Sequence, residues 1–120
     1  MKDVYIVDDE DAAFLSIKMI LERVGGIKSH HFKNAMDALR KIDRYRPDLM
    51  FVDVLMPDCT GLEMLDALRK KNLDIPVVMI SADKTAKTAV ECIKKGALDY
   101  VIKPFRAKEV IEKTEHYMKK

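Results

Sequence analysis

The chain has 120 residues, which suits one globular domain and is too short for two. Hydrophobic residues make up 48% of it and charged residues 35%, a balance that excludes a mainly disordered or low-complexity chain. The net charge of +2 is too small to indicate nucleic-acid binding through bulk charge, so no direct nucleic-acid partner is expected.

Membrane and disulfide-rich classes are also disfavoured. The longest apolar runs are only a few residues, far shorter than a transmembrane helix, and acidic residues arrive too early for a secretory signal. We therefore expect a cytoplasmic protein. Cys59 and Cys92 match no metal-ligand or redox spacing, and in the cytoplasm they are expected to be free thiols.

The chain begins with a strand, a helix and a weaker strand. The apolar run at residues 4–7 predicts the first strand. Apolar residues spaced for one face then predict a helix over residues 11–24, which the glycines at 25–26 end. Residues 27–32 read as a strand with several polar side chains, which is typical of an edge position.

The middle of the chain repeats this alternation. Asn34 is a suitable N-cap for a helix that ends before Pro47. The third strand, residues 49–52, is almost wholly apolar, as a strand buried on both faces would be. A loop at 56–61 leads to a helix that carries apolar residues over 62–68.

The last third predicts two more strands and two more helices. The strands are residues 77–80 and 100–102, and the helices run from about 85 to 95, ending at Gly96, and from about 107 to 118. Strict alternation of strand and helix predicts a parallel sheet covered on both faces.

Polar side chains are expected at one edge of this sheet, because the carboxyl ends of parallel strands share that edge and ligands bind there. The residues at those strand ends are Asp8, Asp9 and Glu10, Asp53, Ser81, and Lys103 with Pro104. Asp8, Asp9 and Asp53 cannot all stay ionised side by side without compensation, which Mg²⁺ would supply. The alternative is that each acid favours the dipole of the following helix, which explains one of them better than three.

Phosphoryl transfer to a carboxylate suits this edge. A carboxylate can act as nucleophile and become an aspartyl phosphate, while a metal and Lys103 would neutralise charge on the phosphoryl oxygens. Lys103 is expected to pair with Asp53, and Ser81 is either a helix cap or a donor to a phosphoryl oxygen. The Lys103–Pro104 bond is a candidate cis peptide, although most such bonds are trans.

Fast hydrolysis is not expected at this edge, because no histidine, cysteine or second base is predicted there. His30, His31 and His116 are all expected to be exposed and non-catalytic. The site therefore suits holding a phosphoryl group better than rapid turnover.

Four segments together resemble the receiver domain of bacterial two-component response regulators, of the chemotaxis-Y type. They are IVDDE, FVDVLMPDCTG, ISA and GALDYVIKPF, and the resemblance covers residues 1–120 as one domain. It implies an α/β, flavodoxin-like doubly wound (βα)5 fold with a five-stranded parallel sheet in the order 2-1-3-4-5. It also implies a phosphorelay switch rather than an enzyme that turns over a substrate.

The resemblance also implies roles for single residues. Asp53 would be the phosphoacceptor, assisted by Lys103 and Ser81. The implied ligands of Mg²⁺, or of Mn²⁺ in its place, are Asp9 directly, Asp8 directly or through water, Asp53, and the backbone carbonyl of Leu55. Ser81 and Tyr100 would be the switch residues, although Tyr100 could equally be an ordinary edge-strand aromatic. Leu55 and Asp83 occupy positions that tune the phosphoryl lifetime, and an apolar Leu55 predicts slow to moderate self-dephosphorylation.

The implied phosphodonor is a sensor histidine kinase or a histidine phosphotransfer protein. Candidate docking residues are Phe14, Ile17, Pro104 and Phe105, of which Phe14 could equally belong to the core. Candidate output residues on the fourth helix, fifth strand and fifth helix are Lys87, Val90, Glu91, Tyr100 and Lys113. The output is a downstream protein or a fused domain, and the chain is a monomer or a weak, phosphorylation-dependent dimer. A stand-alone receiver, a relay intermediate and a piece of a larger regulator remain open.

Three other classes of protein fit these residues less well. A flavodoxin-like FMN carrier is disfavoured because the acids after the first strand would repel the cofactor phosphate. A phosphatase with an aspartyl-phosphate intermediate usually carries a second acid two residues after the nucleophile, where this chain has Leu55. A receiver-like module that only binds partners is disfavoured by the complete set of acids, Ser81 and Lys103.

Overall fold

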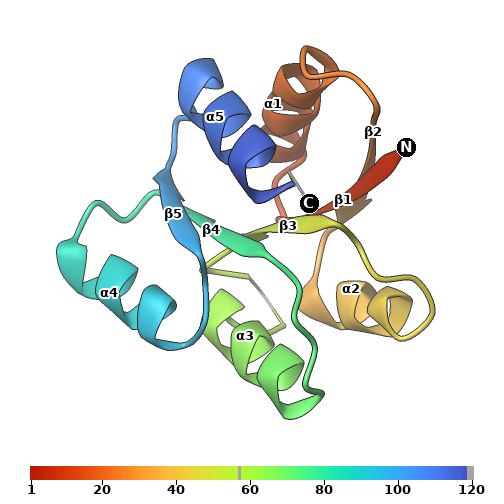
Figure 1. Cartoon of the computed structure of the whole chain (residues 1–120). Helices are drawn as coiled ribbons and strands as arrows, with labels where there is room; N and C mark the ends of the chain where they lie inside the picture. Colours follow the sequence, from red (N-terminus) through yellow and green to blue (C-terminus); the bar gives the residue numbers. More distant parts are fainter. Residues whose placement is uncertain (57, 119–120) are drawn as a thin grey trace.

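The computed structural model describes residues 1–56 and 58–118, and here five strands alternate with five helices (Figure 1). The strands are β1 (Lys2–Val7), β2 (Ile27–Phe32), β3 (Leu49–Asp53), β4 (Val77–Ser81) and β5 (Asp99–Ile102). The helices are α1 (Asp11–Glu22), α2 (Ala35–Ile42), α3 (Gly61–Lys70), α4 (Ala86–Lys94) and α5 (Ala107–Tyr117). All strand pairs are parallel and the order is β2-β1-β3-β4-β5, which confirms the predicted flavodoxin-like topology.

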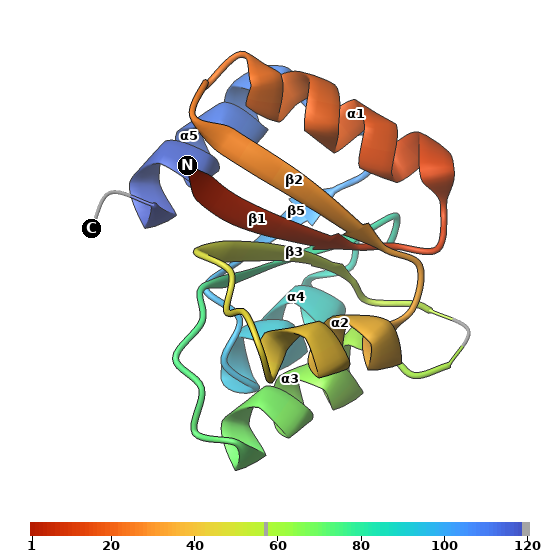
Figure 2. The same ribbon diagram turned by 90° about the vertical axis from the view of Figure 1, so that its right-hand side faces the viewer.

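Helices cover both faces of the sheet, α1 and α5 on one and α2, α3 and α4 on the other (Figures 1 and 2). The inner strands β3 and β4 are buried along their whole length, which explains their apolar sequences. β2 lies at the edge and keeps half-buried polar residues, as predicted. None of the helices described in 1–56 and 58–118 is both long and apolar enough to span a membrane.

The core has two halves, one on each face of the sheet. Val4 and Ile6 of β1 join the cluster under α1 and α5, whereas Tyr5 and Val7 join the cluster under α2, α3 and α4. This alternation follows from the two-residue period of a strand. Burial on both faces holds β1 and β3 rigidly side by side, so the residues at their carboxyl ends have fixed positions.

Local sequence signals set several helix boundaries. Asn34 caps α2 as predicted, since its side chain accepts the backbone N–H of Asp37 at 2.8 Å. Thr60 and Glu63 form a capping box that starts α3. α1 ends at Glu22, two residues before the predicted end, whereas α2 ends at Ile42, before Pro47 as predicted. Turns with short-range hydrogen bonds follow both helices.

Candidate functional site

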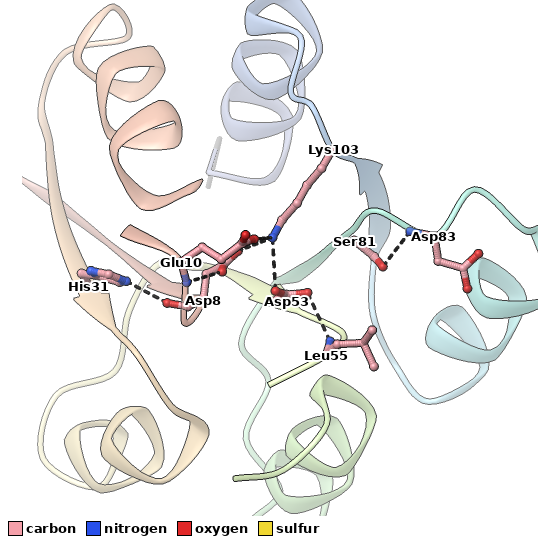
Figure 3. A network of polar contacts seen from close by, with 8 residues as sticks. All are labelled: Asp8, Glu10, His31, Asp53, Leu55, Ser81, Asp83 and Lys103. Atoms are coloured by element: carbon pink, nitrogen blue, oxygen red, sulfur yellow. Dashed lines mark hydrogen bonds and ion pairs between the residues drawn. The ribbon is translucent and has the colours of Figure 1, made fainter. Parts of the chain in front are cut away.

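Most of the predicted polar residues lie together at the carboxyl edge of the sheet (Figure 3). Asp8 directly follows β1, Asp53 ends the adjacent β3, Ser81 ends β4 and Lys103 follows β5. Asp8 is fully buried and Asp53 is only 6% exposed. The loops after the strands therefore present a compact charged site on a rigid, apolar base.

The Lys103 ammonium is the centre of this site. Its Nζ lies 2.9 Å from Oδ2 of Asp8, 2.7 Å from Oε1 of Glu10 and 3.2 Å from Oδ2 of Asp53. Backbone groups bind the second oxygens of the two aspartates: the Glu10 N–H donates to Asp8 Oδ1 at 2.9 Å, and the Leu55 N–H donates to Asp53 Oδ1 at 3.2 Å. The predicted pairing of Lys103 with Asp53 is confirmed.

Burial and neighbouring charges shift the ionisation of this group. Burial, with a contribution from the charge of Asp8, raises the pKa of Asp53 to about 6, against the opposing effects of the Leu55 N–H and Lys103. Burial alone would lower the pKa of Lys103, but its hydrogen bond to Glu10 and its close contact with the Asp8 carboxylate raise that pKa well above its ordinary value. The site thus holds a charged lysine beside Asp53, whose carboxylate has a pKa of about 6.

The carboxylates have the composition of a site for a hard divalent cation. Oxygens of Asp8, Glu10 and Asp53 lie within 4.8 Å of one another. Oδ2 of Asp8 is buried and accepts no well-directed hydrogen bond from any described residue, although the Lys103 ammonium is close to it. A buried oxygen of this kind fits a metal ligand, so the donor set agrees with the expectation of Mg²⁺.

Asp9 lies differently from its neighbours. It is exposed and, within residues 1–56 and 58–118, does not belong to the group formed by Asp8, Glu10 and Asp53. The third carboxylate of that group belongs to Glu10, for which no separate role was predicted. Its position among three consecutive acids gave no signal of this, because the loop after β1 has no regular period.

Ser81, Asp83 and Tyr100 connect the site to α4. Ser81 is buried, and its Oγ accepts the backbone N–H of Asp83 at 3.0 Å. The Tyr100 hydroxyl donates to the Asp83 carbonyl at 2.7 Å. The Asp83 carboxylate in turn accepts the Thr88 hydroxyl at 2.6 Å and the Thr85 N–H at 2.8 Å, and these bonds lower its pKa. Both predicted switch residues therefore contact the residue that anchors the start of α4.

One predicted docking residue is wrong. Ile17 is completely buried in the core beneath α1 and cannot contact a partner. Its spacing with Ile20 places it on the inner face of the helix. The exposed apolar residues of α1 are Leu15 and Met19, at 52% and 68% exposure. Phe14 is half-buried and packs against the core.

The remaining candidate partner residues occupy a variety of environments. Pro104 is exposed after a cis Lys103–Pro104 bond, which confirms that expectation, and Phe105 is half-buried. The exposed members on α4 are Lys87, Val90 and Glu91. Lys113 forms an ion pair with Asp99 at 2.9 Å, so its charge is already partly engaged.

Two histidines differ from the expectation of full exposure. His30 and His31 are half-buried, because each side chain bonds to the strand beside it. Nε2 of His30 lies 2.8 Å from Asp3 Oδ1, and Nε2 of His31 lies 2.8 Å from the Asp8 carbonyl oxygen. The His31 ring also stacks on Phe14, with the two planes only 3° apart. Polar residues on both faces of β2 left no clear period from which to predict this.

Fold and site define an α/β domain with a buried acidic site and a lysine at the carboxyl edge of a parallel sheet. The family model described as the response regulator receiver domain matches residues 4–115. The chain belongs to this family, whose members are phosphoacceptor signalling switches of two-component systems.

Curated relatives include both long and short proteins. The chain is 38% identical to the nitrogen assimilation regulatory protein NtrX of Azorhizobium caulinodans. The match covers 94% of this chain and 25% of NtrX. The chain thus spans about a quarter of that relative's length. The chain is also 35% identical to the chemotaxis protein CheY of Listeria monocytogenes. This match covers 96% of this chain and 97% of CheY.

Solved structures agree with this assignment. The receiver domain of the Francisella response regulator 1452 has a TM-score of 0.91 and 30% identity, covering 99% of this chain and 98% of that one. The receiver domain of NtrX from Brucella abortus has a TM-score of 0.89 and 34% identity, covering 98% of both chains. This chain therefore shares its fold with both of these receiver domains.

Proposed function

We propose that residues 1–120 form one receiver domain in which Asp53 accepts a phosphoryl group from a phosphohistidine. The observation that carries this proposal is the position of Asp53, at the end of β3 with Asp8 beside it and Lys103 at 3.2 Å. In the transfer, an oxygen of Asp53 forms a bond to phosphorus as the P–N bond of the donor breaks. The imidazole of the donor leaves with the electron pair of that bond and takes up a proton.

Side chains at the edge stabilise the charge that is transferred. The Lys103 ammonium offers N–H donors to the phosphoryl oxygens, and its raised pKa keeps it charged throughout. Ser81 offers a hydroxyl from the end of β4. Candidate ligands for Mg²⁺, or Mn²⁺ in its place, are Asp8, Asp9, Glu10, Asp53 and the backbone carbonyl of Leu55. When bound, the cation supplies positive charge to the phosphoryl oxygens.

Slow turnover is part of the proposal, which makes the chain a switch rather than an enzyme. The Leu55 side chain is apolar and 68% exposed, so it offers no group to orient a hydrolytic water. The Asp83 carboxylate is already engaged by Thr85 and Thr88. A phosphoryl lifetime of only seconds in the purified protein would contradict this part.

The conformational change would pass through Ser81 and Tyr100 to α4. A phosphoryl group that draws the Ser81 hydroxyl toward Asp53 would disturb its bond with the Asp83 N–H, and Tyr100 contacts the same residue. The face formed by α4, β5 and α5 would then present a changed surface to an output protein or domain. For the phosphodonor, a sensor histidine kinase or a histidine phosphotransfer protein, we propose docking in the cytoplasm over α1 through Leu15 and Met19, with Pro104 and Phe105 as further contacts.

Incubation with acetyl phosphate and Mg²⁺, followed by intact-mass measurement, tests the acceptor. We expect one phosphoryl adduct in the wild-type chain and none in Asp53→Asn. Asp58→Asn is the matched control, because it removes a carboxylate from the same loop and should still form the adduct. An adduct that persists in Asp53→Asn would place the acceptor elsewhere, and repeated turnover of phosphate esters would favour a phosphatase.

A further inference from the structure

The Lys103 ammonium donates hydrogen bonds to Glu10 and Asp53, and it also lies in ion-pair contact with Asp8. A lysine ammonium has three N–H groups. Three carboxylates surround it, those of Asp8, Glu10 and Asp53, and all lie within 3.2 Å of Nζ. A phosphoryl oxygen on Asp53 would therefore compete with these carboxylates for the Lys103 ammonium.

The three contacts differ in how easily they can break. The side chains of Asp8 and Asp53 are 0% and 8% exposed, so releasing either would leave a buried carboxylate without its cation. The Glu10 side chain is 63% exposed and would simply return to water. Glu10 is thus the partner that Lys103 can leave most readily, although its contact of 2.7 Å is the shortest.

The position of Glu10 at the start of α1 would ordinarily suit a helix-capping side chain. Glu10 occupies the N-cap position of α1, where side chains often accept N–H groups of the first turn. Among the described residues the Glu10 carboxylate makes no such bond. It accepts a hydrogen bond from Lys103 instead, a residue near the other end of the chain. The backbone N–H of Glu10 donates to Asp8, which fixes the loop in this orientation (Figure 3).

We propose that Glu10 is a positioning residue that holds the Lys103 ammonium over Asp8 and Asp53 in the unphosphorylated chain and competes with the phosphoryl group for it. This inference rests on the proposed role of Asp53. Glu10 keeps the lysine at the site before transfer and then releases one N–H to the incoming oxygen. The lowered pKa of Glu10, caused by its hydrogen bond and charge interaction with Lys103, agrees with this pairing.

Glu10→Gln tests the proposal because it keeps the size of the side chain and removes its charge. The first measurement is the ¹⁵N NMR signal of the Lys103 ammonium, identified by its loss in Lys103→Arg. In the free protein the signal should shift and exchange faster with water in Glu10→Gln. With beryllofluoride bound at the acceptor, wild type and variant should give the same signal, because Lys103 has then left Glu10.

The second measurement is the rate of phosphorylation by acetyl phosphate. Rates are compared at Mg²⁺ concentrations that saturate each variant, since losing a negative charge also weakens cation binding. An exposed ion pair is weak, so we expect Glu10→Gln to be faster by about two- to fivefold. Glu10→Asp should restore part of the wild-type behaviour, and Glu22→Gln, at the other end of α1, should match wild type in both measurements.

The outcomes separate this inference from the proposed function. An unchanged Lys103 signal in free Glu10→Gln, or a rate at saturating Mg²⁺ that is equal to or lower than wild type, would overturn the role of Glu10. The NMR comparison of the free proteins needs no phosphoryl transfer. It therefore remains decisive even if Asp53 forms no adduct, a result that would refute the proposed function alone.

Discussion

The carboxylate of Asp58 accepts the backbone N–H of Met36 at 3.1 Å, which joins the loop after β3 to the first turn of α2. The same carboxylate accepts the N–H of Ala35 at 3.2 Å. Burial alone would raise the pKa of Asp58, but these bonds hold it below its ordinary value. The loop that follows the proposed acceptor is therefore bonded to a helix from an earlier part of the sequence.

Asp58→Ala should destabilise the fold by about 1 kcal/mol, the usual effect of losing a helix N-terminal acceptor. The free energy of unfolding in urea measures this, with Asp74→Ala as an exposed control. Because the folded-state pKa of Asp58 is lowered, its contribution is present above the unfolded pKa of about 3.8 and is lost as the pH falls through the folded value. A loss of stability that is equally large in strong acid would contradict this explanation.

Asp53→Asn should make the metal-free protein more stable at neutral pH. The pKa of Asp53 is about 6 in the folded state against 3.8 for the free side chain, so folding favours the protonated form. That favourable contribution is complete below pH 3.8 and is lost as the pH rises through about 6. Above this range the wild type folds around an unfavourable charge, and removing it should raise the free energy of unfolding by on the order of 1–3 kcal/mol.

Urea unfolding in EDTA at several pH values checks this prediction. The advantage of Asp53→Asn should shrink toward zero as the pH falls below 4, since both states of the wild type then carry the proton. Asp9→Asn, which removes an exposed acid from the same edge, should show no comparable gain. If Asp53→Asn were less stable than wild type at pH 7.5, the prediction would be wrong. Lys103 would then stabilise the ionised Asp53 carboxylate by more than burial and Asp8 destabilise it.

Mg²⁺ should raise the melting temperature of the wild-type protein, because a ligand that binds only the folded state stabilises it. At a concentration one hundred times its Kd, the gain would be about 2.7 kcal/mol. Asp8→Asn should lose most of this response, since Asp8 supplies the buried oxygen without a well-directed hydrogen bond. Thermal unfolding with and without the cation measures it, and an undiminished response in Asp8→Asn would exclude that residue as a ligand.

The fold and the location of the site were predictable because both follow from local patterns. Apolar runs mark the strands, Asn34 and Gly96 mark helix ends, and parallel strands necessarily bring Asp53 and Lys103 to one edge. These signals depend on residues close together in sequence and on one topological rule.

Details that depend on side-chain direction were not predictable in the same way. The loop after β1 has no period, so nothing indicated that Glu10 rather than Asp9 groups with Asp8 and Asp53. The contact of Asp58 with α2 joins segments that only the folded sheet brings together. Ile17 was a different case, because its spacing with Ile20 already indicated the inner face of α1.

Gly61 allows α3 to begin directly against the end of β3. A Cβ atom at this position would lie 2.5 Å from the backbone carbonyl oxygen of Asp53 and 3.0 Å from Cα of Val54. The Gly61 N–H also donates to the Val54 carbonyl at 2.7 Å, so the two segments cannot easily move apart. Because Gly61 has no side chain, the start of α3 can pack directly against the backbone of the proposed acceptor, Asp53.

Gly61→Ala should therefore destabilise the protein by about 1–3 kcal/mol, as overpacking against backbone does, and should slow adduct formation by shifting Asp53. Gly25→Ala is the matched control: it has a positive φ of 81° but no described atom within 4 Å of the added Cβ, so it should lose only about 1–2 kcal/mol of stability through backbone strain. Its rate of phosphorylation by acetyl phosphate should stay at the wild-type value. If Gly61→Ala formed the adduct as fast as Gly25→Ala, the close contact with the Asp53 carbonyl would not control the position of the acceptor carboxylate.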